Sequence, residues 1–230
     1  MKTNSYKSCD QLRWFRPIVL LLLLCGCAPV GPQPLDHIHG CGDGSACGSA
    51  FPHGRWQFVH LIDFRLPGGS GGTVIGITVL DGTSLKCALT TTEGMTLFEA
   101  TDNGELTIIH ALPPFDKPGF AQGLMADVRA LFIRPPGSPA CGTFGSESGC
   151  RFGDGERTTD VALGDDGCHQ ITSWTAAGLP TRTISTHDCT LRHGYRLVRS
   201  LVLKAWGKSG YVLTLRLINV QSPMDTENQG

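Results

Sequence analysis

The chain has 230 residues, and its 19 Lys and Arg are almost balanced by 20 Asp and Glu, which gives a formal net charge of -1. This balance argues against a protein that binds nucleic acid or another polyanion electrostatically, because such proteins carry an excess of basic side chains. Only 17% of the residues are charged, while Gly occupies 30 positions. Low charge and many glycines indicate a β-rich fold with tight turns, and the length fits one domain.

The first 26 residues are organised like a secretory leader. Basic side chains up to Arg16 are followed by an apolar run over 18–24 and then by a small residue before Cys27. The apolar run is about half the length that a membrane-spanning helix needs. The sequence at 24–27, Leu-Cys-Gly-Cys, resembles the lipobox of bacterial lipoproteins.

The lipobox resemblance implies that residues 1–26 are removed and that Cys27 is acylated, so that a lipid anchors the mature chain to a membrane. Many lipoproteins retained in the inner membrane carry Asp after this cysteine, whereas Ala28 stands here. The resemblance therefore implies the outer membrane of a bacterial envelope, with the chain on its periplasmic face. The alternative is a plain secretory leader with a chance cysteine.

Residues 27–54 are expected to form a lipidated, flexible tether. Prolines and glycines are frequent in this stretch, and such a composition cannot bury a core. These prolines and glycines are Pro29, Pro32, Pro34, Gly40, Gly42, Gly44 and Gly48.

The same stretch holds side chains of the kinds that bind soft metals. His37, His39 and Cys41 lie close together, and Cys47 and His53 follow. Histidine and cysteine are ligands of zinc and copper. Their spacing matches no standard zinc module, however, and Cys41 and Cys47 can simply pair as a disulfide. We therefore predict no metal site and keep a metal-handling lipoprotein as an alternative.

Ten strands and a central helix are predicted over residues 55–222. Within 55–66, Trp56 and Phe58 begin an alternating apolar face that also contains His60, and a period of two indicates a strand. Further strands are predicted at 73–80, 85–92, 95–101 and 105–111, and again at 156–163, 168–175, 181–189, 195–205 and 211–220. A stripe at helical spacing predicts one helix after Pro118: Phe120, Leu124, Met125, Val128, Leu131 and Phe132.

The remaining stretches are predicted to be irregular: a loop at 137–155 and a polar tail at 223–230. A long antiparallel sheet must curl, and its concave face must be filled. We therefore predict a mainly β fold with a central helix, in which an unclosed antiparallel β-barrel of about ten strands is covered by a helical lid.

This order of elements resembles the LolA/LolB-like group of periplasmic lipoprotein carriers, and within it outer-membrane lipoproteins of that fold. Three stretches carry the likeness: the short strands over 73–111 with Gly-Met-Thr-Leu-Phe-Glu at 94–99, the helix at 119–133, and the closing strands over 160–220. The resemblance implies a hydrophobic cavity that carries lipid-modified proteins or other amphiphiles.

A cavity for acyl chains is physically reasonable, because burying one methylene group contributes about 0.8 kcal/mol. We expect its lining to comprise Trp56, Phe58, Ile62, Phe64, Leu97, Leu124 and Val128. The alternative is that these side chains form an ordinary packed core. LolB-type proteins touch the membrane through an exposed apolar loop residue, and Leu66 lies at a comparable place here. It is equally the last core residue before a turn, which is the simpler interpretation.

Seven cysteines follow Cys27 in the sequence, and the periplasm permits disulfides. They are Cys41, Cys47, Cys87, Cys141, Cys150, Cys168 and Cys189. Neighbouring cysteines suggest the pairs 41–47, 141–150 and 168–189, which serve as staples. Cys87 then stays unpaired on a strand and buried.

No catalytic signature is recognisable: neither a nucleophile elbow nor a phosphate-binding loop is present. We therefore predict a protein that is not an enzyme and has no cofactor. The leading hypothesis is a monomeric, lipid-anchored protein that binds a hydrophobic ligand or lipoprotein acyl chains. The alternative from a different class is a structural or interaction lipoprotein with a filled core.

Overall fold

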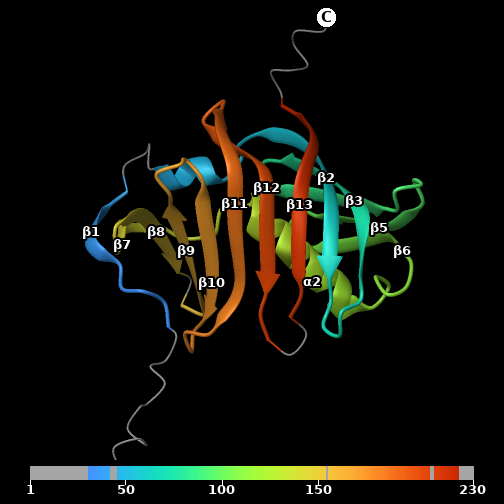
Figure 1. Ribbon diagram of the computed structural model, residues 1–230, viewed down its shortest axis with the longest axis horizontal. Coiled ribbons are helices and arrows are strands. Elements are labelled where there is room, and N and C mark those ends of the chain that lie inside the picture. The colour runs from blue at the N-terminus through green and yellow to red at the C-terminus, as the bar shows by residue number, and fades with distance from the viewer. Residues whose placement is uncertain (1–30, 42–45, 154, 208–209, 223–230) are drawn as a thin grey trace, which may run out of the picture. The chain divides into compact units, whose positions relative to one another are not determined.

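The computed structural model describes residues 31–41, 46–153, 155–207 and 210–222 (Figure 1). The predicted leader, Cys27 and the tail therefore lie outside the described residues. The described part contains one sheet, one α-helix and one short 3-10 helix. In chain order the elements are β1 (Asp36–Gly40), η1 (Ala46–Ala50), β2 (Arg55–Arg65), β3 (Gly71–Asp81), β4 (Ser84–Thr90), β5 (Thr96–Asp102), β6 (Leu106–Ala111), α2 (Pro118–Phe132), β7 (Ala140–Phe144), β8 (Glu147–Gly153), β9 (Arg157–Leu163), β10 (His169–Thr175), β11 (Pro180–Arg192), β12 (Tyr195–Ala205) and β13 (Val212–Gln221).

The sheet has thirteen strands in the order β1-β7-β8-β9-β10-β11-β12-β13-β2-β3-β4-β5-β6. All pairs of neighbours are antiparallel, and most are consecutive hairpins. The sheet is unclosed, because β1 and β6 end it without pairing to each other. Figure 1 shows it curling around α2, which crosses behind β12, β13 and β2. The predicted unclosed antiparallel barrel with one helix is thus confirmed, although it has more strands than expected.

Strand β2 shows how the sequence builds the concave face. Its residues alternate between inward and outward directions, and Trp56, Phe58 and His60 all point inward and are buried. Glycines in β3 make room for the next inward side chains. A Cβ added at Gly76 would lie 2.5 Å from Cδ1 of Ile62, so a larger residue at that position would force the isoleucine to move.

Helix α2 begins at Pro118, which suits the first turn because proline lacks the backbone N–H that would be unpaired there. The helix ends at Phe132, and the N–H of Ile133 still donates to the carbonyl oxygen of Arg129. Its apolar stripe faces the sheet and is buried through Ala121, Met125, Val128, Leu131 and Phe132. The predicted helix is confirmed within two residues at each end.

Two irregular segments of the prediction are wrong. Part of the expected tether forms β1 and η1, and most of the expected loop at 137–155 forms the hairpin β7–β8. Strand β1 pairs with β7, so residues 36–40 extend the sheet instead of hanging free. These strands are short and rich in Gly and Cys, so they lack the alternating apolar pattern on which a sequence-based assignment depends.

The disulfide pairing explains how these short strands are held. Cys41 bridges Cys141 and Cys47 bridges Cys150, each closing about a hundred residues of chain. The expected pairs 41–47 and 141–150 are therefore wrong, because the N-terminal segment is stapled across to β7–β8. The expected pair 168–189 is confirmed, and so is a free, buried thiol at Cys87.

Candidate ligand-binding site

Aromatic side chains fill the concave face beneath the C-terminal half of α2. The rings of Trp56 and Phe58 stack with centroids 5.8 Å apart, and Phe58 stacks on Phe132 of the helix at 4.9 Å. Tyr195 of β12 meets both Trp56 and Phe58 edge-on. Such contacts add about 0.5–1.5 kcal/mol per pair to the burial of the rings. This end of the half-barrel is a packed core.

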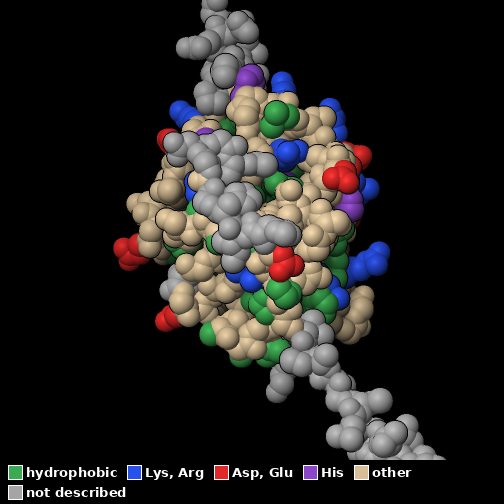
Figure 2. Space-filling model, turned by 90° about the vertical axis from the view of Figure 1, so that its left-hand side faces the viewer, with side chains coloured by type: hydrophobic (Ala, Val, Ile, Leu, Met, Phe, Trp, Pro, Cys, Tyr) green, Lys and Arg blue, Asp and Glu red, His purple; other side chains and the backbone are tan. Residues whose placement is uncertain are grey.

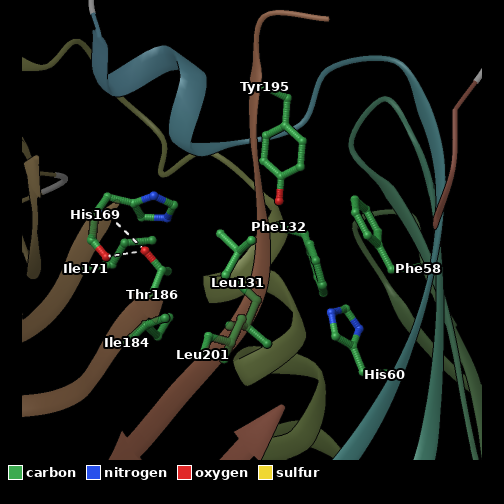
Figure 3. Close-up of a pocket in the computed structure, with 11 residues that line it drawn as sticks. Phe58, His60, Leu131, Phe132, His169, Ile171, Ile184, Thr186, Tyr195 and Leu201 are labelled. Atoms are coloured by element: carbon green, nitrogen blue, oxygen red, sulfur yellow. Dashed lines mark hydrogen bonds between the residues drawn. The ribbon is translucent and has the colours of Figure 1, made fainter. Parts of the chain in front are cut away.

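A small cavity lies inside it, between α2, β2 and β10–β12 (Figure 3). Its volume is about 10 Å³, which is about the space that one water molecule requires. Apolar side chains make up most of its wall: Phe58, Leu131, Phe132, Ile171, Ile184, Val198 and Leu201. A chain of methylene groups cannot enter this space without a rearrangement.

Polar groups also face this cavity. Figure 3 shows Tyr195 pointing its hydroxyl toward the centre, with His169 and His60 on opposite sides of the cavity. Thr186 accepts from the backbone N–H of His169 at 2.8 Å and donates to its carbonyl oxygen at 2.7 Å. Nδ1 of His169 is buried and has no hydrogen-bond partner among the described residues.

Burial keeps the two histidines neutral. It lowers the pKa of His60 to about 4. It also lowers the pKa of His169 to about 4, with a smaller contribution from the positive charge of Arg196. Both shifts follow from the cost of placing an imidazolium in an apolar interior. At neutral pH the cavity therefore contains neutral polar groups and no charge.

Side-chain ion pairs hold α2 to the sheet on two flanks. Nε and Nη2 of Arg129 donate to the carboxylate of Asp102 in β5, both at 2.5 Å. Two residues earlier, Asp127 accepts from Arg182 in β11 and from the hydroxyl of Tyr211. Positions two apart point about 200° apart around a helix. The helix is thus bridged to both arms of the curled sheet.

The electrostatics of the two flanks differ. The hydrogen bond from Arg129 holds the pKa of Asp102 below its usual value. Burial raises the pKa of Asp127, and the charge of Arg182 opposes that rise. An unpaired carboxylate in this position would be costly, since a buried charge needs a partner.

The expected lining residues fall into two groups. Trp56, Phe58 and Val128 are buried in the packed core. The other four are partly buried against that core: Ile62, Phe64, Leu97 and Leu124. Leu97 lies at an irregularity in the β4–β5 pairing, one residue before the inward Phe98. All four therefore combine apolar surface with partial access to solvent, and Ile62, Phe64 and Leu124 lie away from this irregularity.

A wider groove lies at the β2–β3 turn, beside the adjoining ends of β2, β3 and β13. Its volume is about 630 Å³, within the range of small-molecule sites. Its lining is mostly polar or glycine: Asp63, Phe64, Arg65, Gly69, Gly71, Gly72, Thr73, Val212 and Thr214. Asp63 accepts from Thr73 at 2.6 Å and from Arg216 at 2.8 Å. This groove lacks the continuous apolar wall that an acyl chain would need.

Leu66 lies in the turn after β2, at the end of the sheet where three further hairpin turns carry exposed apolar side chains. The exposed fractions are 37% for Leu66, 57% for Met95, 62% for Leu179 and 43% for Trp206. The strand pairings bring these turns to the same end of the sheet, and Figure 1 shows the turns β2–β3, β10–β11 and β12–β13 at the bottom. Figure 2, a side view, also shows apolar side chains gathered at the lower end.

Part of the ligand set that a metal-handling lipoprotein would need is not free to bind a metal. Cys41 and Cys47 would have to be thiolates, and both are in disulfides. The side chains of His37 and His39 lie outside the described residues, while His53 is exposed. The sulfur atoms of Cys41, Cys141 and Cys150 lie within 4.8 Å of one another because the disulfides Cys41–Cys141 and Cys47–Cys150 are neighbours.

Sequence reasoning missed the polar groups of this site. His169, Asp127 and Asp102 carry no motif, and their partners lie far away in the chain. His60 does carry a sequence signal, because it is a polar residue on the apolar face of an alternating strand. None of the helices in the described ranges is long and apolar enough to cross a membrane.

Comparisons with known proteins give distant likenesses of fold. No protein-family model matches the chain, and no curated protein matches it. Among solved structures, the chain is similar to a LolA superfamily protein from Nitrosomonas europaea, at 9% identity over 81% of this chain and 96% of that one, with a TM-score of 0.49.

Two other solved structures are similar at the same level. A Vibrio parahaemolyticus domain described as outer membrane lipoprotein-sorting is 7% identical over 80% of this chain and 94% of that one, with a TM-score of 0.42. A DUF1329 family protein from Desulfovibrio piger is 8% identical over 78% and 90%, with a TM-score of 0.43. The likenesses concern the course of the chain and not its function.

Proposed function

We propose that this protein is a lipid-anchored protein of the bacterial envelope that binds a hydrophobic or acyl-chain ligand between α2 and the inner face of the half-barrel. It would act as a monomer by binding and handing over, without bond chemistry. The anchor would be Cys27, and the location the periplasmic face of the outer membrane. The sequence at 24–28 supports the anchor and the location.

The observation that carries the proposal is the attachment of α2. The helix is an amphipathic element between the arms of an open sheet, and ion pairs through Asp127 and Arg129 bridge it to both arms. None of the described strands depends on it for its backbone hydrogen bonds. A helix held in this way can move outward while the sheet stays intact.

Access to the site would begin at Ile62, Phe64 and Leu124. These side chains are apolar, only partly buried and adjacent to the packed core. An acyl chain that displaced α2 would replace helix–sheet contacts with contacts of the same kind, at about 0.8 kcal/mol for each buried methylene. Leu66 and the neighbouring exposed turns would meet the membrane from which the ligand comes.

The test is uptake of a fluorescent fatty acid by the chain from residue 28 onward, refolded with its disulfides intact. We expect binding by the unchanged protein and at least a tenfold loss with Phe64→Asp, because a carboxylate on the inner face opposes apolar burial. The matched control is Ile218→Asp, since Ile218 is exposed on β13. The control should bind like the unchanged protein.

A second candidate is a structural or interaction lipoprotein. The small interior cavity favours it, since about 10 Å³ leaves no room for a ligand while α2 stays in place. Under this alternative the unchanged protein takes up no fatty acid and carries no lipid when it is purified from an envelope-containing host. That result would exclude the carrier function.

A further inference from the structure

The two N-terminal disulfides lie directly beside each other. Cys141 and Cys150 are opposite partners in the antiparallel pair β7–β8. Their sulfur atoms are 3.1 Å apart although each is bonded to a different cysteine. Opposite residues of an antiparallel pair have Cα atoms about 4.5–5.5 Å apart, which is a separation that a disulfide accepts. The hairpin thus holds a second pairing ready without moving its backbone.

We propose that these four cysteines form a thiol–disulfide exchange site whose co-substrate is an external dithiol, such as the dithiol of an oxidoreductase. The point of entry is Cys41. It is partly exposed, whereas Cys47, Cys141 and Cys150 are buried. A thiolate from outside therefore reaches the Cys41–Cys141 bridge first, and it reaches it at the Cys41 sulfur.

The exchange then proceeds in three balanced steps. The external thiolate bonds to the Cys41 sulfur and releases the Cys141 thiolate. This thiolate attacks the neighbouring Cys150 sulfur, which forms a Cys141–Cys150 bridge and releases the Cys47 thiolate. The second thiol of the dithiol resolves the mixed disulfide at Cys41. The dithiol is oxidised by two electrons and gives up two protons, and Cys41 and Cys47 gain them as thiols.

The consequence is a change in what the N-terminal segment is attached to. In the described pairing, both bridges tie the segment of β1 and η1 to the hairpin β7–β8. After exchange, the hairpin carries its own bridge and the segment keeps only noncovalent contacts. The number of bridges at the site falls from two to one, but both covalent links between the segments are lost together.

A nonreducing tryptic digest separates the outcomes, because of where Lys and Arg fall. Residues 28–55 contain Cys41 and Cys47 without an internal cleavage site, and residues 130–151 contain Cys141 and Cys150, since Arg134 precedes a proline. The two peptides are linked before exchange and separate after it. The Cys168–Cys189 bridge joins two other peptides and serves as an internal control.

The experiment treats the folded chain, from residue 28 onward, with substoichiometric dithiothreitol and then blocks thiols with iodoacetamide. We expect free peptide 130–151 with an internal bridge and peptide 28–55 alkylated at Cys41 and Cys47. This product should exceed the singly reduced, still linked product by more than about tenfold, because the reacting sulfurs are already in contact. Linked peptides alkylated at Cys41 and Cys141 would overturn the proposal.

A matched pair of variants tests the same step without a reductant. Cys47→Ser leaves Cys150 as a thiol beside the Cys41–Cys141 bridge, so the pairing should shift to Cys141–Cys150 and unlink the peptides. Cys150→Ser leaves Cys47 as the thiol, and its sulfur lies outside the cluster of three, so the link should remain. Equal linkage in both variants refutes the proposal. The wild-type digest decides the question if either variant fails to fold.

Discussion

The buried histidines predict a loss of stability in mild acid. The folded protein keeps His60 and His169 neutral down to a pKa of about 4, whereas an unfolded chain protonates histidine near pH 6.5. Between these values the unfolded state binds more protons, so the free energy of unfolding falls as the pH is lowered through this window. At pH 5 each histidine removes about 2 kcal/mol, or about 4 kcal/mol together, from a typical total of 5–15 kcal/mol.

The assay is urea unfolding at pH 7.5 and at pH 5. We expect the unchanged protein to lose about 4 kcal/mol between them and His60→Leu to lose about 2 kcal/mol, since one of the two groups no longer titrates. His110→Leu is the control, because His110 is exposed on β6. Asp127 acts in the opposite direction, as its pKa is raised, but it acts equally in all three proteins. Identical losses in the unchanged protein and His60→Leu would refute the reasoning.

Three further predictions concern the helix and the sheet. Gly123→Ala should stabilise the protein by about 1 kcal/mol in the same urea assay, because a Cβ there meets no atom within 4 Å and alanine favours helix. Gly76→Ala should destabilise it by about 1–3 kcal/mol, because its Cβ would crowd Ile62. A destabilised Gly123→Ala protein or a stabilised Gly76→Ala protein would contradict this packing. Arg129→Gln should leave Asp102 without its charged partner and speed hydrogen exchange in α2 but not in β12, corresponding to a loss of about 1–3 kcal/mol in the local stability of the helix. Adding Asp102→Asn to this variant should recover part of that stability. Unchanged exchange in α2 would show that the ion pair does not hold the helix.

The parts of the fold that the sequence predicts are those with a strong periodic signal. Trp56, Phe58 and His60 alternate along a long strand, and the stripe ending at Phe132 has helical spacing, so β2 and α2 were located within a few residues. Local patterns of this kind are set by the geometry of one element.

The missed features depend on contacts between distant parts of the chain. Strand β1 exists because β7 and two disulfides hold it, and a choice of the nearest cysteine as partner cannot reveal that. The small size of the cavity could not be predicted either, since alternation along a strand is identical in a filled and in a hollow barrel. The contact between the rings of Phe58 and Phe132 shows that this end of the half-barrel is filled.

The pairing of β13 with β2 has a consequence for the order in which the molecule forms. These two strands lie side by side in the middle of the sheet although their residues are roughly 150 positions apart in the chain. A growing polypeptide can complete the hairpins β2 to β6 early, but one edge of β2 then stays open until the final strand has been synthesised. We expect this exposed edge to be the point at which a nascent chain needs protection from aggregation.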